Sequence, residues 1–359
     1  MLVGIHKDTY GKFGEYILRF EQILELNDIP HIRLDANDPD FWEQVAKVDI
    51  FIYRWEHTDH YYNLATSILP VIEKEMGKKC YPDQATCWHY DDKIKQFYLL
   101  KVHGFPVIPS WVFWDKKKAL QWLDTAEVPV VFKLKGGAGS SSVMLLKTKS
   151  EARAMINRMF GKGMLVGSVP NVGSSKSVFS NPMRRLRRFA SGLRRKLRGE
   201  DSRHWWTLHK NYVYFQKFCP GNEWDTRVAT IGDRAYAFRR FVRKNDFRAS
   251  GSNSWDLDRS KIDMRFVEIA HAISQKFKFQ SMAYDFVYDE NRNPMLIEMS
   301  YTYGEPDYPD FNDGYWDTNM VWHDGNYHTR ELIMADLLGI PDLKTPVIID
   351  HDYSHIKVK

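Results

Sequence analysis

The sequence predicts an α/β protein with two or three domains. Its 359 residues exceed the roughly 100–200 residues of one ordinary domain. Hydrophobic residues make up 43% and charged residues 27%, which provides for sizeable cores and excludes general disorder. Over the first part of the chain, short apolar runs alternate with stretches of helical period. This alternation is the pattern of βαβ units and predicts a small parallel sheet.

The N-terminal part, expected over 1–88, carries this pattern. Strands are expected at 2–6, 31–34 and 49–55, and helices at 14–27 and 38–46. The first strand is not followed by a GxGxxG motif, which argues against a dinucleotide site there. Three side chains at the end of the third strand are candidate substrate contacts: Arg54, Trp55 and His57.

Two further units follow, expected at 89–212 and 213–359. The second starts with a helix near Asp92, which Gly104 and Pro106 end. Its strands at 128–134 and 143–147 flank a Gly/Ser loop at 136–142, and a helix follows at 150–160. The third has strands at 212–218, 225–231, 234–241, 282–288 and 295–299 and a helix at 263–276. Gly232-Asp233 predicts a tight hairpin between two of these strands.

The positive charge is concentrated in one segment. The net charge is +5, yet residues 184–198 (RRLRRFASGLRRKLR) hold eight basic side chains and no acid; without them the balance is 43 minus 46, or −3. Their apolar residues recur at helical spacing, which predicts a basic amphipathic helix within an insertion at 161–209. Such a helix favours an anionic membrane or glycan, and a solvated face is the alternative. No nucleic-acid motif is found, so no nucleic-acid partner is expected.

Composition predicts a cytoplasmic protein, either free or held peripherally at the inner face of the membrane. No apolar run approaches the roughly 18–20 residues of a spanning helix, and the N-terminus does not resemble a signal peptide. The three cysteines, Cys80, Cys87 and Cys219, are too few for a disulfide scaffold and indicate a reducing compartment. The spacing of the first two matches no zinc knuckle, and buried free thiols are expected.

Several cations are placed as an anion site would need them. Lys93 lies at a helix start, and Lys133 ends the strand before the Gly/Ser loop. Glycines let backbone amides approach phosphate oxygens, and an ammonium group neutralises them. The pattern is not a P-loop, because no GK[ST] follows at the required spacing. Arg239, Arg240 and Arg248 add guanidinium groups that match phosphate and carboxylate, although exposed arginines are often merely solvated.

Two acids lie in apolar strands. Asp285 and Glu298 are on adjacent expected strands joined by the turn at 289–294. A carboxylate in an apolar strand is costly unless it is paired or bound to a cation, and two that face each other repel. We therefore expect a divalent metal ion between them, with a structural salt bridge as the alternative.

Over residues 89–305 the sequence resembles the ATP-grasp superfamily, and most the branch of ribosomal-protein glutamate ligases and glutathione synthetases. The most specific match is Arg239-Arg240, then five residues, then Asp246-Phe247-Arg248. The resemblance implies an N-terminal Rossmann-like domain and two α+β lobes that clasp ATP. It also implies residues that bind the nucleotide: Lys93 and Lys133 contact phosphate, and the loop over the triphosphate consists of Gly137, Ala138, Gly139, Ser140 and Ser141. Adenine is contacted by Gln216, Lys217 and Phe218, and ribose by Glu223. Two magnesium ions are bound by Asp285, Glu298 and Ser300. Ser300 stands where the family usually has Asn.

The resemblance implies an ADP-forming carboxylate–amine ligase that works through an acyl phosphate. In this role Arg240, Arg248 and Lys133 are the expected catalytic residues. The aromatic and acidic tail offers Tyr303, Trp316 and Asp317 as further substrate contacts, and it resembles ATP-grasp proteins of bacterial surface-polysaccharide biosynthesis. This favours a hexuronic-acid carboxylate, lipid-linked or glycan-borne, joined to an amino acid or amine. A soluble amino-acid or peptide ligase and a non-catalytic nucleotide-dependent membrane- or glycan-binding module are the alternatives.

Overall fold

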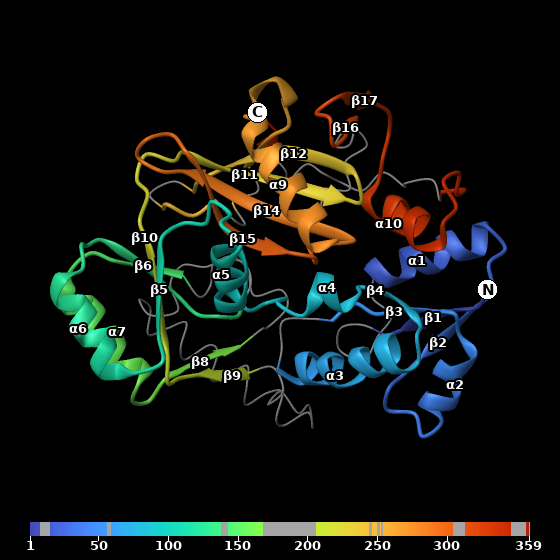
Figure 1. The fold of residues 1–359 in the computed structure, drawn as a ribbon, viewed down its shortest axis with the longest axis horizontal. Coiled ribbons are helices and arrows are strands. Elements are labelled where there is room, and N and C mark those ends of the chain that lie inside the picture. The colour runs from blue at the N-terminus through green and yellow to red at the C-terminus, as the bar shows by residue number, and fades with distance from the viewer. Residues whose placement is uncertain are drawn as a thin grey trace.

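Three sheet-based parts surround a central helix in the computed structural model (Figure 1). The structure describes residues 1–7, 15–55, 59–137, 143–167, 206–243, 246–249, 252, 254–303, 313–345 and 357–358. None of the helices in these ranges has the length and apolar character needed to cross a bilayer.

The N-terminal part is a three-layer α/β unit, as predicted. Its strands β1 (Val3–His6), β2 (His31–Leu34), β3 (Ile50–Ile52) and β4 (Lys79–Tyr81) are parallel, in the order β2-β1-β3-β4. One core cluster joins α1 (Glu15–Leu26) to one face, and another joins α2 (Phe41–Lys47) and α3 (Asp59–Pro70) to the opposite face. A π-helical turn, Val71–Glu75, continues α3. The third strand is shorter than expected.

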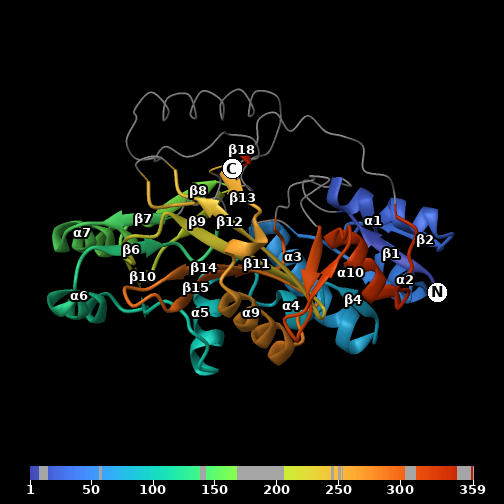
Figure 2. The ribbon, with the colours of Figure 1, turned by 90° about the horizontal axis from the view of Figure 1, so that it is seen from above.

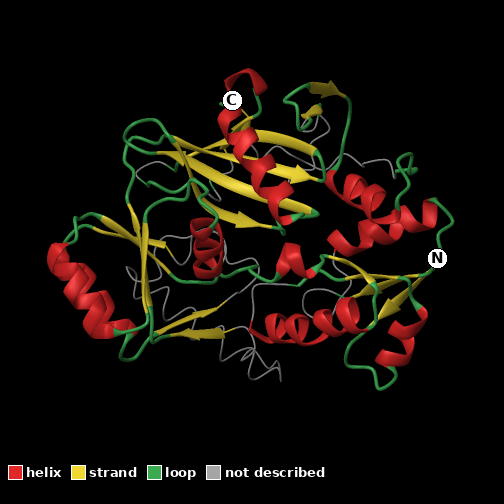
Figure 3. Ribbon diagram, in the orientation of Figure 1, coloured by secondary structure: helices red, strands yellow, loops and turns green. Residues whose placement is uncertain are grey.

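The small lobe follows α4 (Gln84–Cys87) and α5 (Lys93–Val102). Its antiparallel sheet has the order β5 (Ser110–Phe113), β10 (Val213–Lys217), β6 (Val130–Lys133) and β7 (Val143–Leu146). The helices α6 (Lys116–Thr125) and α7 (Lys149–Met159) lie side by side at its outer end (Figure 3). The division of the chain into three domains stays a prediction, but the pairing places β10 with β5–β7 and not with the third unit where we expected it.

Alternation along β6 turns one side chain toward the helices and the next away from them. Phe132 lies 6.0 Å from Phe215, whose ring stacks on Trp122 of α6 at 5.1 Å. Successive side chains of a strand point to opposite faces. Lys133 therefore projects from the other face, the one against which α5 packs through Phe97 and Tyr214.

A two-stranded ribbon, β8 (Met164–Gly167) and β9 (Trp206–His209), leaves the small lobe. The expected insertion therefore starts and ends within one antiparallel ladder. Residues 168–205, which include the basic segment at 184–198, lie outside the described residues. The amphipathic helix stays a prediction.

The large lobe is built on β15 (Pro294–Ser300), β14 (Ser281–Tyr288), β11 (Trp224–Ile231), β12 (Arg234–Phe241), β13 (Ser254–Asp256) and β18 (Lys357–Val358), in that order. The predicted hairpin at Gly232-Asp233 is confirmed by the pairing of Ile231 with Arg234. Figure 2 shows α9 (Met264–Phe277) along one side of this sheet. A short hairpin of β16 (Gly314–Trp316) and β17 (Trp322–Asp324) pairs with β12, and a 3-10 turn (Arg259–Lys261) and α10 (Thr329–Leu338) complete the lobe.

The face of this sheet opposite α9 is divided in two. One half is apolar and packs against α10 and the N-terminal part through Ala229, Ile231, Tyr236, Phe238 and Ala283. The other half of the same strands carries charged residues at alternate positions: Asp225, Arg227, Arg240 and Asp285. Two of these four residues, Arg240 and Asp285, are candidate site residues of the sequence analysis.

Candidate active site

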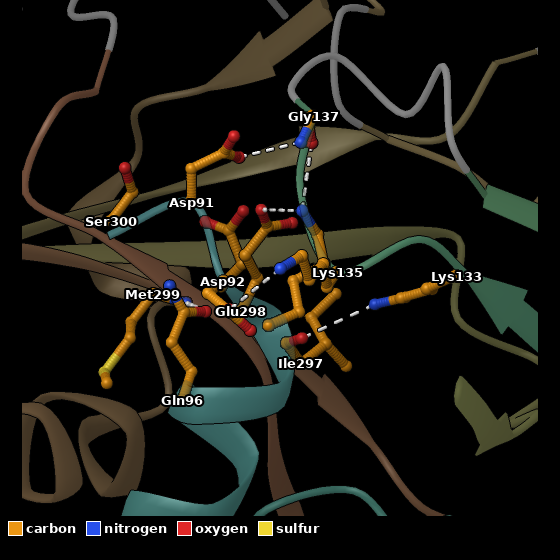
Figure 4. Close-up of polar contacts among 12 residues, drawn as sticks. Asp91, Asp92, Gln96, Lys133, Lys135, Gly137, Ile297, Glu298, Met299 and Ser300 are labelled. Carbon is orange, nitrogen blue, oxygen red and sulfur yellow. Dashed lines mark hydrogen bonds and ion pairs between the residues drawn. The ribbon is translucent and has the colours of Figure 1, made fainter. Parts of the chain in front are cut away.

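Two buried lysines meet beside one carboxylate. Lys93, the first residue of α5, is 4% exposed, and Lys133, the last residue of β6, is 6% exposed. The Nζ of Lys93 lies 3.1 Å from Oε1 of Glu298 and donates a hydrogen bond of 2.9 Å to the Gly137 carbonyl. The Nζ of Lys133 donates to the Ile297 carbonyl at 3.4 Å (Figure 4). The two lysines predicted to contact phosphate are thus brought together against β15.

The surroundings of the two lysines shift their pKa values in opposite directions. Burial lowers the pKa of Lys133 to about 8, although the charge of Glu298 opposes this effect. Burial also opposes the charged form of Lys93, but Glu298 and Asp91 outweigh it and hold the pKa of Lys93 above its ordinary value. The buried charge of Lys133 is therefore less well compensated than that of Lys93. A bound anion would stabilise the ammonium group of Lys133 more than that of Lys93.

The turn before α5 holds the start of the Gly/Ser loop. The backbone N–H of Lys93 donates to the Lys135 carbonyl at 2.8 Å, and the N–H of Gly137 donates to Oδ1 of Asp91, also at 2.8 Å (Figure 4). Asp91 has a φ of 51°, in the left-handed region that is uncommon for residues other than glycine. The sequence did not reveal this contact of Asp91, because Gly137 lies 46 residues further along the chain. Ala138, Gly139, Ser140 and Ser141 lie outside the described residues.

Asp225, Arg240 and Asp285, all buried, form an ion quartet with the half-buried Arg227. Arg240 donates to both oxygens of Asp225 at 2.7 Å, and its Nη2 lies 2.7 Å from Oδ2 of Asp285. Arg227 donates to both oxygens of Asp285, at 2.8 and 2.9 Å. The two negative and two positive charges balance, which makes their burial tolerable.

Within the quartet, the pKa values of the two acids are shifted in opposite directions. Burial opposes the charged form of Asp285, but Arg227 and Arg240 outweigh it and hold its pKa well below the usual value. Burial dominates at Asp225 and raises its pKa despite Arg240. Asp285 is thus ionised and forms salt bridges with Arg227 and Arg240. This is the arrangement that the sequence analysis gives as the alternative to a metal ion. Arg227 was missed because sequence spacing does not show that it lies opposite Asp285, as the strand pairing does.

The residues expected to bind magnesium share one face of the sheet. Asp285 pairs with Glu298 across β14 and β15, which confirms that these acids lie on adjacent strands. The Glu298 side chain is 36% exposed, and Ser300 donates its hydroxyl to the Thr302 carbonyl at 2.6 Å. Carboxylate and hydroxyl oxygens suit Mg²⁺. Within the described ranges, however, no three His, Cys, Asp or Glu residues gather as a metal site, and a cation at Asp285 would have to replace a guanidinium contact.

Only one arginine of the predicted set belongs to the quartet. Arg239 points to the other face, where it pairs with Asp256 and lies 4.6 Å above the ring of Trp224. Arg248 pairs with Asp246 at 2.6 Å, and its Nη1 donates to the Val143 carbonyl at 3.4 Å. Val143 is the first described residue after the Gly/Ser loop, so Arg248 lies at the end of that loop.

The residues expected to bind adenine and ribose lie in the segment between the lobes. Gln216 is buried at the end of β10, and the Lys217 N–H donates to the Pro109 carbonyl at 2.8 Å. The ring of Phe218 lies 5.7 Å from that of Phe247, and Glu223 is exposed. Asn222, which the sequence analysis did not single out, bonds the Cys219 carbonyl and the backbone of Tyr288 and fixes this turn to the large lobe.

The candidate substrate residues do not form one group. Trp55 is 1% exposed and packs on Tyr90 and Tyr301, and Trp316 is 7% exposed and packs on Trp322. Both rings are packed in the core of the described structure, and their contact with a substrate stays a prediction.

Two of the other candidates lie at the Gly232 end of the large sheet, and a third lies in the N-terminal part. The Tyr303 hydroxyl lies 2.6 Å from that of Ser281. Asp317 lies 2.9 Å from His323 at the Gly232 end of β12, in a surface hollow of about 500 Å³ away from the quartet. The guanidinium of Arg54 lies over the ring of Tyr16. His57 lies outside the described residues.

The comparisons with known proteins rest on structure. The chain matches no family model, and no curated protein matches its sequence. The solved structure of the ATP-grasp ligase PsnB with a minimal precursor superposes with a TM-score of 0.55 at 13% identity, over 95% of this chain and 99% of that one. N5-carboxyaminoimidazole ribonucleotide synthetase from Thermotoga maritima gives 0.54 at 13% identity, over 97% and 78%. The macrocyclase MdnC from Microcystis aeruginosa, bound to its precursor peptide MdnA, gives 0.52 at 12% identity, over 94% and 100%. The chain has the ATP-grasp fold.

Proposed function

We propose that the protein is an ATP-dependent carboxylate–amine ligase that releases ADP. One observation carries this proposal: Lys93 and Lys133, from two different elements, converge beside Glu298 on the charged face that also holds the quartet. Buried cations next to carboxylates are the arrangement that binds a triphosphate with its metal ions. The fold supports the proposal, because PsnB is a ligase whose structures contain Mg and ADP, or AMPPNP.

The reaction joins an acid to an amine in two balanced steps. A carboxylate oxygen of the acid attacks the γ-phosphorus of ATP, the bond to the β-phosphate oxygen breaks, and ADP leaves. The amine nitrogen then attacks the carbonyl carbon of the acyl phosphate; phosphate leaves, and the nitrogen loses a proton. Magnesium supplies charge screening between the two anions when it is bound.

The chain's own residues would position these groups. Lys93 and Lys133 would hold the phosphates, and we retain the Gly/Ser loop at 136–142 as the segment expected to cover them, with Arg248 beside Val143, the next residue along the chain. Arg240 would face the transferred group, since its guanidinium lies at the centre of the quartet. For the other groups we retain the expected assignments: the backbone of 216–218 for adenine, Glu223 for ribose, and Glu298, Asp285 and Ser300 for magnesium. Glu298 is the most accessible of these ligands.

For the acid substrate we propose a hexuronic acid of a bacterial surface polysaccharide, joined to an amino acid or amine. Because Trp316 is buried, the aromatic residues give less support to a sugar substrate than expected. The proposal of a hexuronic acid therefore depends mainly on the charge of residues 184–198. That segment would hold the protein peripherally at an anionic membrane or glycan. Peptide ligation is the second candidate, favoured because PsnB and MdnC are structures with precursor peptides.

A screen for ADP release tests the proposal. Wild-type protein with Mg–ATP is assayed against uronic acids, amino acids and peptides, each with and without amines. E298Q should abolish ADP formation while the fold is retained. E290Q is the matched control, because Glu290 is an exposed carboxylate in the turn between β14 and β15 that pairs with Lys217. ADP release at the wild-type rate by E298Q would remove the metal assignment, and nucleotide binding without any turnover would leave the non-catalytic module.

A further inference from the structure

The backbone of β15 makes hydrogen bonds to both elements that carry the proposed phosphate lysines. β15 is the first strand of the large sheet, so its backbone is paired with β14 on one side only. The Lys133 ammonium donates to the Ile297 carbonyl at 3.4 Å, and the Met299 N–H donates to Oε1 of Gln96, on α5, also at 3.4 Å (Figure 4). One strand thus contacts α5 and β6 together.

A bulge in β15 turns Glu298 toward the charged half of the sheet. Glu298 pairs with Asp285, and Leu296 pairs with Phe286, the next residue of β14, so Ile297 has no partner on that strand. In a regular strand Leu296 and Glu298 would share one face. Here Leu296 shares the face of Phe286, which packs on α9, and Glu298 shares the face of Asp285. Bulges re-aim side chains in this way and are frequent beside active sites.

Gln96 joins this bulged strand to α5 from a buried position. Its side chain uses both ends: Oε1 accepts from the Met299 N–H, and Nε2 donates to the His89 carbonyl at 3.2 Å. Gln96 is 4% exposed and Met299 is 1% exposed, so water does not reach the Met299 N–H in place of Gln96. A buried N–H that loses its partner carries the full cost of its desolvation. The amide of Gln96 therefore favours one fixed position of α5 against β15.

Gln96 and Lys93 lie on the same face of α5. They are three residues apart, and residues at this spacing are neighbours on a helix surface. Gln96 contacts Met299, and the Lys93 ammonium contacts Glu298, the preceding residue, at 3.1 Å. Two neighbouring residues of the helix face thus contact two consecutive residues of β15. A rotation or slide of α5 that broke the first contact would also separate Lys93 from Glu298.

We propose that Gln96 is a positioning residue of the ATP site: it fixes α5 to the bulged strand and thereby keeps Lys93 beside Glu298. This inference rests on the proposed function, since it takes Lys93 as a phosphate contact. Gln96 is uncharged, and its amide bonds two backbone groups of the protein itself. Its influence on ATP therefore passes through Lys93, and it should disappear when Lys93 is absent.

Titration of the full-length protein with a fluorescent ATP analogue and Mg²⁺ tests this role. Q96M replaces the amide by an apolar side chain of similar length, and we expect it to weaken binding of the analogue at least about threefold. Q280M is the matched control: Gln280 also bonds two backbone groups, the Asp83 N–H and the Cys80 carbonyl, both at 2.8 Å, away from the lysines. Q280M should lose stability in urea but bind the analogue like wild type.

A double-mutant cycle separates positioning from a general loss of structure. If Gln96 acts through Lys93, the two effects do not add, and K93M/Q96M should bind the analogue as weakly as K93M alone. Circular dichroism spectra establish that each variant is folded. Should Q96M be unfolded, Q96N carries the same expectation, because its amide is one methylene shorter and cannot span both backbone groups.

Four results would count against the proposal. If wild type and Q96M bind the analogue equally well, only this inference fails and the proposed ligase function stands. Equal losses of affinity in Q96M and Q280M would show a general effect of lost hydrogen bonds and would also overturn the inference. The same holds if K93M/Q96M binds more weakly than K93M. Wild-type protein that does not bind the analogue at all overturns the proposed function, and this inference with it.

Discussion

Replacing Lys133 by methionine should make the protein more stable and unable to bind ATP. Burial brings the pKa of Lys133 from an ordinary 10.5 to about 8. At about 1.4 kcal/mol per pH unit, keeping this ammonium charged in the folded protein costs about 3 kcal/mol near pH 7. Methionine has a similar length and no charge. It orphans no carboxylate, because Glu298 keeps Lys93 and Asp285 keeps its two arginines.

The direction of the pKa shift determines how the stability gain of K133M changes with pH. The folded pKa lies below the unfolded one, so the unfolded chain binds more protons between about pH 8 and 10.5. The charge penalty is therefore complete below this window and disappears above it. The advantage of K133M should shrink from about 3 kcal/mol at pH 7 to about 1.5 kcal/mol at pH 9.5.

Urea denaturation at the two pH values measures this difference, and titration with a fluorescent ATP analogue measures the loss of nucleotide affinity. K135M is the control, because Lys135 is 44% exposed two residues further along the chain. A K133M protein no more stable than wild type at pH 7, or one whose advantage stays constant up to pH 9.5, would refute the reasoning.

Three further predictions concern other buried groups. D285N should lower the free energy of unfolding by about 3 kcal/mol in urea titrations, because it removes the negative charge that Arg227 and Arg240 share; an unchanged midpoint would contradict this. Burial lowers the pKa of His89 from 6.5 to about 3, so the wild-type protein should lose stability as the pH falls below 6.5. H89F should retain about 3 kcal/mol more of its neutral-pH stability at pH 4.5. Equal losses of stability in wild type and H89F would contradict this. D91G should raise the KM for ATP several-fold through loss of the Gly137 contact, whereas D91N keeps an acceptor oxygen and should resemble wild type; equal KM values would exclude the role of Asp91 in holding the loop.

The local parts of the fold followed from the sequence. Strands and helices have different periods of apolar residues, and these periods located β1, β2 and the hairpin of β11 and β12 within a residue or two. The pairing of Asp285 with Glu298 was also predictable, because a short turn leaves two consecutive strands little choice but to pair. Which sheet a strand joins is a different matter. β10 follows β9 in the chain but pairs with β5 and β6, a choice set by packing that periodicity does not encode.

The site was predictable where one residue type carried the signal. The positions of Lys93 at a helix start and of Lys133 at a strand end before glycines were recognisable in the sequence, and the structure brings the two residues together; their contact with phosphate stays a prediction. Arg227 and Asp91 were missed because their roles depend on neighbours more than 40 residues away, at Asp285 and Gly137. The packing of Trp55 on Tyr301 was also not predictable, since a ring at a strand end can contact either a ligand or a core residue far away in the sequence.

The ribbon of β8 and β9 has a practical consequence. Its last rung joins Gly167 to Trp206, so the chain departs and returns at neighbouring positions. Directly opposed residues of an antiparallel pair are about 5 Å apart, a gap that an Asn-Gly turn closes. A shortened protein in which such a turn replaces 168–205 should therefore keep its three sheets and its lysine–carboxylate centre. We therefore expect that the most basic stretch of the chain can be removed or exchanged while the rest of the fold is kept.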